Sequence, residues 1–408
     1  MLRNAKAFAI VALGSVMVIG CSSAASSGGG SSGSGSGSSG SGSKAPYTVG
    51  YAGPLSGDLA FVGNPYRTGA LAYIDYVNAH GGVNGHQIVF KSGDDTDSPS
   101  VAAGLITQYV QSDNAIAVME GGSTTVTGSL SPVLNGLQVP LVTFSCLPTQ
   151  VFEPMATKYC FDPEVSASSE AVAQAEFALK LVPNAKVMLV PTNNPYGLQW
   201  LPAATNYIKQ HGGSVVSTSY VPLTGVDMSA AVNAVTSSKP QVVISVLNDN
   251  QMVTFGHGLA QQNMQSTPVV NYIDGSDSAT FQTLADPNFY AARVFPYPQD
   301  EQTSGMQEFG AATAAAKIDP SVPIVQDGYF AAYILVAGLK ACGANCTRQE
   351  LFNTMDNLAI QTNGLTPEPY GFTATVHQGV KNVGIYQLKN SSGGTGLPQL
   401  VATVPVGS

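Results

Sequence analysis

Short apolar runs alternate with longer segments of helical periodicity over most of this 408-residue sequence. The short runs are rich in Val and Ile, as buried strands are, and the longer segments carry apolar residues at the three- and four-residue spacing of an amphipathic helix. Parallel strands need a crossover between them, and that crossover is usually a helix. The alternation therefore predicts an α/β fold with parallel sheets flanked by helices.

The predicted elements form two similar series in succession, about 47 to 163 and about 164 to 296. The strands are 47–52, 87–91, 115–119, 140–143, 186–190, 214–220, 241–247 and 268–271, and the helices between them include 65–79, 99–111, 168–181, 196–210 and 249–262. The tail predicts helices near 302–316, 324–341 and 348–357 and strands near 371–376 and 383–389. A single core rarely organises a folded region of this length, so we expect two domains.

The first twenty residues predict a signal peptide. Arg3 and Lys6 precede an uncharged apolar run over 7–19, which is shorter than the roughly 20 residues that span a bilayer. The run ends in VIGC, where Cys21 resembles the lipidated cysteine of a bacterial lipobox; a secretory signal with an incidental cysteine is the alternative. Residues 22–44 are almost wholly Ser, Gly and Ala, which predicts a flexible linker between a lipid anchor on Cys21 and the folded region.

Four further cysteines predict two disulfides, because an exported protein folds in an oxidising compartment. Cys342 and Cys346 lie four positions apart, and Cys146 and Cys160 flank a loop that contains a proline, so pairing between near neighbours is favoured. Two other pairings stay open. A zinc site would require a CxxC pair or a nearby pair of histidines, and the sequence has neither.

Composition and motifs argue against several classes of protein. The net charge is −9 and no basic stripe suited to nucleic acid occurs. After the leader, no run approaches the 18 apolar residues typical of a membrane-spanning helix. The histidines lack metal-ligand spacing, and no nucleophile elbow or phosphate-binding loop is present. We therefore expect no enzyme, no cofactor and no metal.

Seven segments occur in the order in which one protein family carries them. They are VGYAGPLSGDLAFVG (49–63), NAHGGVNGHQI (78–88), DDTDSP (94–99), GGSTT (121–125), VPLVTFSC (139–146), NNPYG (193–197) and YIDG (272–275). Together they resemble the type I periplasmic solute-binding proteins of the branched-chain amino acid, amide and urea transport group. The resemblance covers essentially all of 47–390.

This resemblance implies two lobes joined by crossovers near 163, 296 and 373. Lobe 1 would consist of 45–163 and 297–373, and lobe 2 of 164–296 and 374–408. Proteins of this group close their lobes around a small solute and deliver it to an ABC permease. We expect a monomer, anchored outside the cytoplasm, that binds a small polar solute bearing an amine or amide, an amino acid among them. A lipid-anchored sensor with the same fold is the alternative, and a hydrolase is a third possibility.

Candidate binding residues follow two predicted strands of the first lobe. Phe61 and Val62 come after the GPLSG turn, and the resemblance places them in an apolar wall beside the solute. Ser123 and Thr124 follow the next apolar strand and precede a helix, where hydroxyl and backbone N–H groups can bind an anionic group. The resemblance makes Thr124 a contact for the solute, and helix capping is the alternative interpretation.

The next loop of the first lobe holds Ser145, Cys146 and Leu147. Members of the family that bind amino acids have small residues here, followed by a threonine that contacts the ligand carboxylate. Leu147 departs from that pattern, and its side chain cannot donate a hydrogen bond. An α-amino acid would therefore be held by fewer groups or in a different way.

Five candidates belong to the second lobe and the tail. Tyr196 matches a tyrosine that packs on the ligand, and Asp274 stands where amino-acid-binding members place an acid for the ligand ammonium. Asn248 and Asp249 replace aromatic residues and imply a more polar site, although both also suit a helix cap. Tyr329, in a helix of the tail, is a further candidate. Packing in the core is the alternative for Tyr196, and a turn is the alternative for Asp274.

Overall fold

The computed structural model describes residues 44–144, 146, 158–297, 303–366, 370–388 and 397–406. Its first sheet has the strand order β2-β1-β3-β4-β5, and all neighbouring strands are parallel. The strands are β1 (Lys44–Gly53), β2 (His86–Asp94), β3 (Ala117–Glu120), β4 (Leu141–Val142) and β5 (Cys160–Phe161). The helices that follow them are α1 (Ala60–Ala79), α2 (Pro99–Gln111), α3 (Thr124–Ser129) and α4 (Ser131–Leu137).

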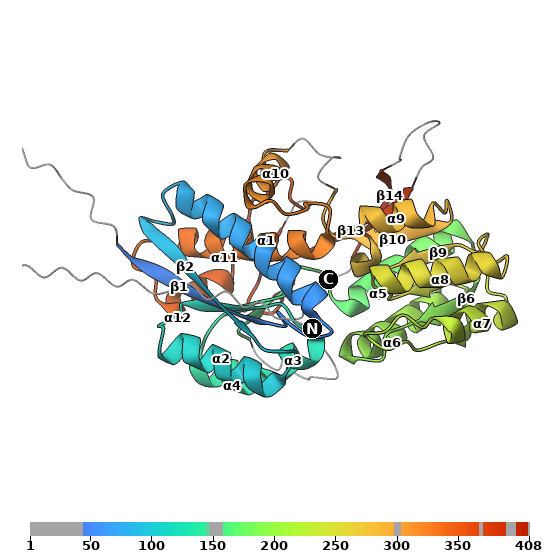
Figure 1. The fold of residues 1–408 in the computed structure, drawn as a ribbon, viewed down its shortest axis with the longest axis horizontal. Coiled ribbons are helices and arrows are strands. Elements are labelled where there is room, and N and C mark those ends of the chain that lie inside the picture. Colours follow the sequence, from blue (N-terminus) through green and yellow to red (C-terminus); the bar gives the residue numbers. More distant parts are fainter. Residues whose placement is uncertain are drawn as a thin grey trace, which may run out of the picture. The chain divides into compact units, whose positions relative to one another are not determined.

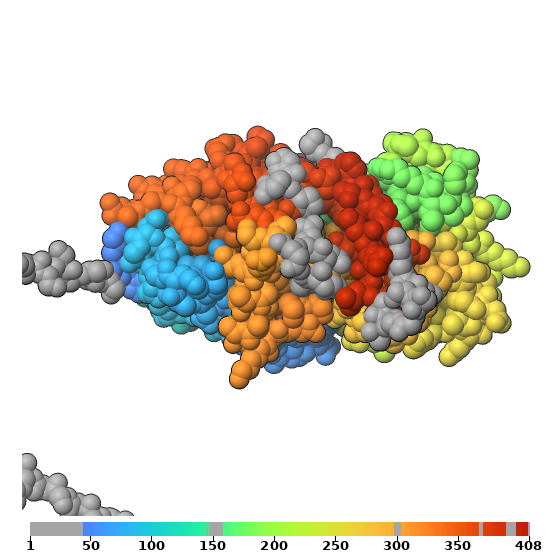
Figure 2. All heavy atoms as spheres, turned by 90° about the horizontal axis from the view of Figure 1, so that it is seen from above, coloured from blue at the N-terminus to red at the C-terminus, as the bar shows by residue number. Residues whose placement is uncertain are grey.

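The second sheet has the strand order β14-β13-β10-β9-β8-β6-β7 (Figure 1). The strands β6 (Lys186–Val190), β7 (Ser214–Thr218), β8 (Val242–Ser245), β9 (Val269–Asn271) and β10 (Phe289–Arg293) are parallel. The hairpin of β13 (Asn382–Leu388) and β14 (Pro398–Pro405) joins β10 in the antiparallel direction. In the space-filling view this red hairpin lies beside the yellow and green segments of the same sheet (Figure 2).

Helices cover both faces of the second sheet. Alternate residues of a strand are therefore buried on opposite sides of the sheet. Val187 and Leu189 of β6 pack in the core that holds α5 (Ala167–Leu181) and α6 (Pro195–Gln210). Met188 and Val190 of the same strand pack in a second core with α7 (Ser229–Ser238), α8 (Asp249–Gln261) and α9 (Ser278–Leu284).

The chain passes between the two sheets three times. It leaves the first sheet after β5, and it returns after β10 to form α10 (Ser304–Ala316), α11 (Pro323–Cys342) and α12 (Arg348–Met355). A short ribbon of β11 (Ala359–Ile360) and β12 (Tyr370–Gly371) precedes the last passage, into β13. The first and third crossovers touch, since the Asp162 N–H donates to the His377 carbonyl at 2.8 Å.

Helix α11 packs directly across α1 on one side of the first sheet (Figure 1). Two glycines allow this approach. A Cβ on Gly69 would collide with the Val325 carbonyl, and a Cβ on Gly328 would collide with the Tyr66 carbonyl. The returning tail is thus held against the N-terminal segment by backbone contact, and α11 is buried along most of its length.

The sequence prediction of an α/β fold with parallel sheets is confirmed. β6 and α2 have the predicted bounds, and α3 is the helix expected after Ser123, whereas β5, β10, β14 and three helices (α4, α7 and α9) were not predicted. The strand predicted near 371–376 is wrong beyond Gly371, because the chain turns back through a Thr373–Val376 bridge as it enters the last crossover. In the described part of the chain, no helix combines the length and apolar character that a membrane span requires.

Candidate functional site

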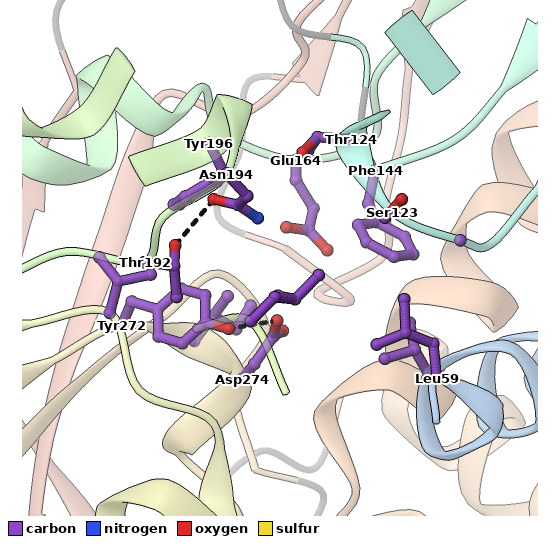
Figure 3. Close-up of a pocket in the computed structure, with 15 residues that line it drawn as sticks. Leu59, Ser123, Thr124, Phe144, Glu164, Thr192, Asn194, Tyr196, Tyr272 and Asp274 are labelled. Carbon is purple, nitrogen blue, oxygen red and sulfur yellow. Dashed lines mark hydrogen bonds between the residues drawn. The ribbon is translucent and has the colours of Figure 1, made fainter. Parts of the chain in front are cut away.

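A cavity lies where loops from the two sheets face each other (Figure 3). Every residue that lines it comes after a strand, at the carboxyl end where open parallel sheets bind ligands. The first sheet supplies Leu59, Val62, Gly122, Ser123, Thr124, Phe144 and Glu164, and the second supplies Thr192, Asn194, Tyr196, Leu223, Val246, Tyr272, Ile273 and Asp274.

Five of the residues singled out in the sequence line this cavity. Val62 contributes to its apolar wall, with Leu59 and Phe144. Ser123 and Thr124 stand at the start of α3, and Tyr196 and Asp274 face them from the second sheet. The structure therefore brings together residues that are far apart in the sequence, from Val62 to Asp274.

Two polar candidates lie away from the cavity lining and serve α8 and its neighbours. Asn248 is the N-cap of α8, where its side chain accepts a hydrogen bond from the Gln251 N–H. Asp249 accepts hydrogen bonds from the Thr280 hydroxyl at 2.6 Å and from the Asp277 N–H at 3.2 Å. Both side chains thus have the capping and bonding roles that the sequence left as alternatives.

Three more candidates also lie outside the lining, and two cannot be placed. Phe61 is 43% exposed on α1. Tyr329 is buried in α11, with its ring against Tyr73 and Phe309. Cys146 is buried in a disulfide, and its neighbours Ser145 and Leu147 lie outside the described residues.

Sequence patterns missed several lining residues, of which Glu164 matters most. Glu164 follows β5, a strand of only two residues that carries no recognisable period. Phe144 and Thr192 each lie two positions beyond the end of a strand, and a rule that takes the loop after each strand would have found both. Tyr272 belongs to the YIDG segment, but its role depends on a hydrogen bond that no sequence pattern reveals.

The second-sheet side of the cavity carries an acid and two tyrosines. The Tyr272 hydroxyl donates to the Asp274 carboxylate at 2.7 Å, and the Tyr196 ring lies 5.9 Å from the Tyr272 ring. Behind them, the Glu170 carboxylate accepts from the Tyr196 hydroxyl and from the Ile273 N–H. Burial raises the pKa of Asp274 and raises that of Glu170 to about 7. The wall thus offers oxygen acceptors in a poorly hydrated place.

The cavity has no cation of its own. Among the described residues that line it there is no Lys, Arg or His. The buried Arg293 uses its guanidinium on Ser276, Phe295 and Gln326 instead. Because a buried carboxylate without a partner is costly, this arrangement favours a ligand that brings positive charge.

The predicted anion-binding position at the start of α3 is already used by the protein itself. The Gly122 N–H donates to Glu120 at 2.5 Å, and the Ser123 N–H lies 3.3 Å from the Asp97 carboxylate. The Ser123 hydroxyl caps the helix by accepting from the Val126 N–H. Of the polar side chains here, Thr124 keeps a buried hydroxyl oxygen with no hydrogen-bond partner, so this position suits a hydrogen bond better than an anion.

Buried acids predict an unusual dependence of stability on pH. Burial raises the pKa of Glu120 to about 8, and that of Glu170 to about 7. Each group keeps a proton in the folded state that it would lose on unfolding above its ordinary pKa of about 4.3. The free energy of unfolding must therefore fall as the pH rises toward the raised values.

We expect the midpoint of thermal unfolding of the ligand-free protein to be about 5 °C or more lower at pH 8 than at pH 5. Acids whose pKa is lowered, such as Asp94, titrate below this interval and do not offset the effect. Scanning calorimetry at several pH values measures it, and Glu120→Gln should flatten the curve. A midpoint that rises between pH 5 and pH 8 would contradict the assignment.

Both predicted disulfides are confirmed. Cys146 pairs with Cys160 and Cys342 pairs with Cys346, with Cα separations of 5.8 Å and 5.5 Å. The first bridge joins the loop after β4 to β5, next to Phe144 of the cavity. It therefore ties Cys146 to β5 on the first-sheet side of the site.

Comparison with known proteins finds relatives that are all described as binding proteins. The profile of the family described as "Periplasmic binding protein" matches residues 46–395. A Leu/Ile/Val-binding protein homolog of Brucella melitensis is 23% identical over 303 residues, which are 74% of this chain and 80% of the relative. A Leu/Ile/Val-binding protein of Rhizobium johnstonii is 25% identical over 325 residues, with the same two shares.

Solved structures share the fold at low sequence identity. A branched chain amino acid ABC transporter protein from Thermus thermophilus, with bound valine, has a TM-score of 0.79 at 18% identity and covers 90% of this chain and 97% of its own. A solute binding protein of an ABC transporter from Rhodopseudomonas palustris, in complex with 3,4-dihydroxy benzoic acid, has a TM-score of 0.76 at 18% identity and covers 88% and 98%. These relatives are binding proteins rather than enzymes. The chain therefore belongs to the periplasmic binding protein family, and it shares the fold of solute-binding proteins of ABC transporters.

Proposed function

We propose that this chain is the extracytoplasmic solute-binding component of an ABC importer and that it captures a small polar solute bearing an amine. The observation that carries the proposal is Asp274. Its carboxylate lines the cavity, accepts a hydrogen bond from Tyr272, and has no cationic partner among the described lining residues. A protonated amine would supply the missing charge and could donate to the remaining lone pairs.

The apolar part of the lining restricts the rest of the solute. Leu59 and Phe144 lie on one side, opposite Tyr196 and Tyr272 (Figure 3), and Val62 also belongs to the apolar lining. A short aliphatic or aromatic body fits between such walls. The solute class thus combines a cationic nitrogen with a modest apolar skeleton.

The relatives bind solutes of two chemical classes, and the lining of the cavity supports one of them as the solute of this chain. One solved structure holds valine, which has an amine, and others hold 3,4-dihydroxy benzoic acid or 4-hydroxybenzoate, which have none. An anionic benzoate beside the Asp274 carboxylate would meet like charge, with backbone donors at Gly122 and Ser123 already in use. This favours the nitrogen-bearing class.

The two lobes are expected to close around the solute because both of them contribute residues to the cavity lining. Ser123 and Thr124 come from the first sheet, whereas Tyr196 and Asp274 come from the second. A solute that contacts both sets binds the closed form better, and only that difference in affinity can shift the equilibrium toward closure. Three crossover segments provide the hinge.

The experiment that tests this proposal is a thermal-shift screen of the purified protein at neutral pH. The panel contains amino acids, amides, urea, polyamines and hydroxybenzoates. We expect stabilisation by amine-bearing compounds, because a ligand at 100 times its dissociation constant contributes about 2.7 kcal/mol to the free energy of unfolding. Stabilisation by nitrogen-free acids alone would overturn the role of Asp274.

We also propose that lipid on Cys21 anchors the protein and that residues 22–44 act as a tether; of these, only Lys44, the first residue of β1, lies within the described residues. The support is the signal-peptide pattern that ends in VIGC and the Ser/Gly composition of the linker. A lipid anchor on such a linker would keep a monomeric binding domain near its permease at high effective concentration.

Cys21→Ala is expected to release the protein from the membrane fraction while leaving solute affinity unchanged, because the anchor lies outside the cavity. Immunoblots of membrane and soluble fractions measure retention, and calorimetric titration measures affinity. If Cys21→Ala remained in the membrane fraction at the wild-type level, the anchor would have to be something else.

A further inference from the structure

Glu164 is a second carboxylate in the cavity, supplied by a different part of the chain from Asp274. It follows β5 in the first crossover, and its side chain extends from the first-sheet side toward the centre of the cavity (Figure 3). Glu164 is 6% exposed, and its Oε1 atom is buried without a hydrogen-bond partner. Burying such an oxygen unpaired is unfavourable, so the site is incomplete as it stands.

Asp327 of α11 stands beside Glu164, and it too is a buried acid with one unpaired carboxylate oxygen. It is 1% exposed, and its Oδ1 atom also has no partner. Burial raises the pKa of both groups, that of Asp327 to about 8, and Asp327 raises the pKa of Glu164 further. A hydrogen bond joins the two carboxyl groups, which therefore share a proton near neutral pH. The charged groups that act on this pair are the acids Asp162, Asp274 and Glu170 and the guanidinium of Arg293.

An independent group in the lining of the same cavity points to the same kind of ligand. Thr124 is 8% exposed and lines the cavity, and its hydroxyl oxygen has no partner. A hydroxyl oxygen can accept a hydrogen bond from an ammonium group, as a carboxylate does. Thr124 and Glu164 thus offer two oxygen acceptors on the first-sheet side, across the cavity from Asp274.

We infer that the cavity has two positions for protonated nitrogen, one at Asp274 and one at Glu164 with Thr124, and that its solute is a small compound with two protonated amino groups. Such a compound is called a dication below, whether or not it also bears a carboxylate. This inference rests on the proposed function and names the solute class more narrowly. A diamine or a basic amino acid has the required chemistry: two amino groups separated by a short aliphatic chain. The chain would lie along the apolar wall of Leu59, Val62 and Phe144.

Binding of a dication should displace the proton that Glu164 and Asp327 share. One positive charge enters beside the pair and one proton leaves to solvent, so the local charge is unchanged. The affinity for the dication is therefore expected to increase as the pH rises from 6 to 8, because less proton has to be displaced at higher pH. A monoamine bound only at Asp274 should release fewer protons.

Two matched pairs of compounds test the inference by calorimetric titration of the full chain in detergent. 1,4-Diaminobutane and butylamine differ by one amino group, as ornithine and norvaline do. In the pair that binds, we expect the dication to bind at least about 30-fold more tightly than its partner. Glu164→Gln should reduce this ratio to about threefold or less, and Glu176→Gln, a change at a surface ion pair, should leave it at the wild-type value.

The outcomes separate this inference from the proposed function. If each dication binds no more tightly than its monoamine partner, and Asp274→Asn weakens both, the second position is refuted while the amine site stands. If only nitrogen-free acids bind, both proposals fail. Should Glu164→Gln not fold, the proton count decides: titrations of the wild type in buffers of different ionisation enthalpy should show about one more proton released by the dication, and equal release would refute the inference.

Discussion

Gly328→Ala is expected to destabilise the protein by about 3 kcal/mol or more, because it would push apart two helices that touch through their backbones. A Cβ on Gly328 would lie less than 3.0 Å from the Tyr66 carbonyl, and Gly69 has the reciprocal relation with Val325. Neither carbonyl can move without shifting a whole helix. The midpoint of urea denaturation measures the loss, with the slope of the transition as a check that unfolding stays cooperative.

Gly310→Ala is the matched control for this prediction. Gly310 also lies within a helix, α10, but a Cβ there would meet open space. Alanine has a higher helix propensity than glycine, so this variant should gain about 0.5–1 kcal/mol. Equal effects of the two substitutions would show that helix propensity, rather than the contact of α1 with α11, determines the result.

The same helix crossing positions part of the site. Asp327 directly precedes Gly328 on α11, and Val62 lies on α1 in the cavity wall. A displacement of α11 from α1 would therefore move Asp327 away from Glu164. We attribute two effects to Gly69 and Gly328. They allow the tail to pack tightly against the first sheet, and they place the buried carboxyl pair.

The layout of strands and helices was largely predictable, because their hydrophobic periods are local properties of the sequence. β6 (Lys186–Val190) and α2 (Pro99–Gln111) were found with their observed bounds. The two-residue strand β5 is too short to carry a period, and it exists because neighbouring β4 supplies its hydrogen bonds. Such pairing is decided by tertiary structure.

The site was predictable to the extent that it follows strand ends and a familiar order of motifs. Val62, Ser123, Thr124, Tyr196 and Asp274 were placed in the cavity on those grounds. Asn248 and Tyr329 were placed there too, although one caps α8 and the other packs in the core. A sequence shows that a residue follows a strand or lies in a helix, but it does not show which way the side chain points.

Glu164 could not be predicted as a site residue for a different reason. Its importance comes from what surrounds it: the carboxyl of Asp327, which is 163 positions later in the chain, and the unpartnered hydroxyl of Thr124. The sequence around it, FDPEVS, has the appearance of an ordinary polar turn. Only the packing of α11 beside the first crossover turns that segment into a buried acid pair.

The role of Asp274 is tested most directly by calorimetric titration of the wild type and of Asp274→Asn with the tightest amine from the thermal-shift screen. Asparagine keeps the shape of the side chain and can still accept from Tyr272, but it lacks the charge that an ammonium needs. We expect Asp274→Asn to bind at least about 30-fold more weakly, as loss of one partner of a buried charge pair typically costs about 2–5 kcal/mol. Asp319→Asn, at an exposed turn, should bind like the wild type. Equal affinity of Asp274→Asn and the wild type would contradict the proposal that this cavity recognises its solute through a cationic nitrogen.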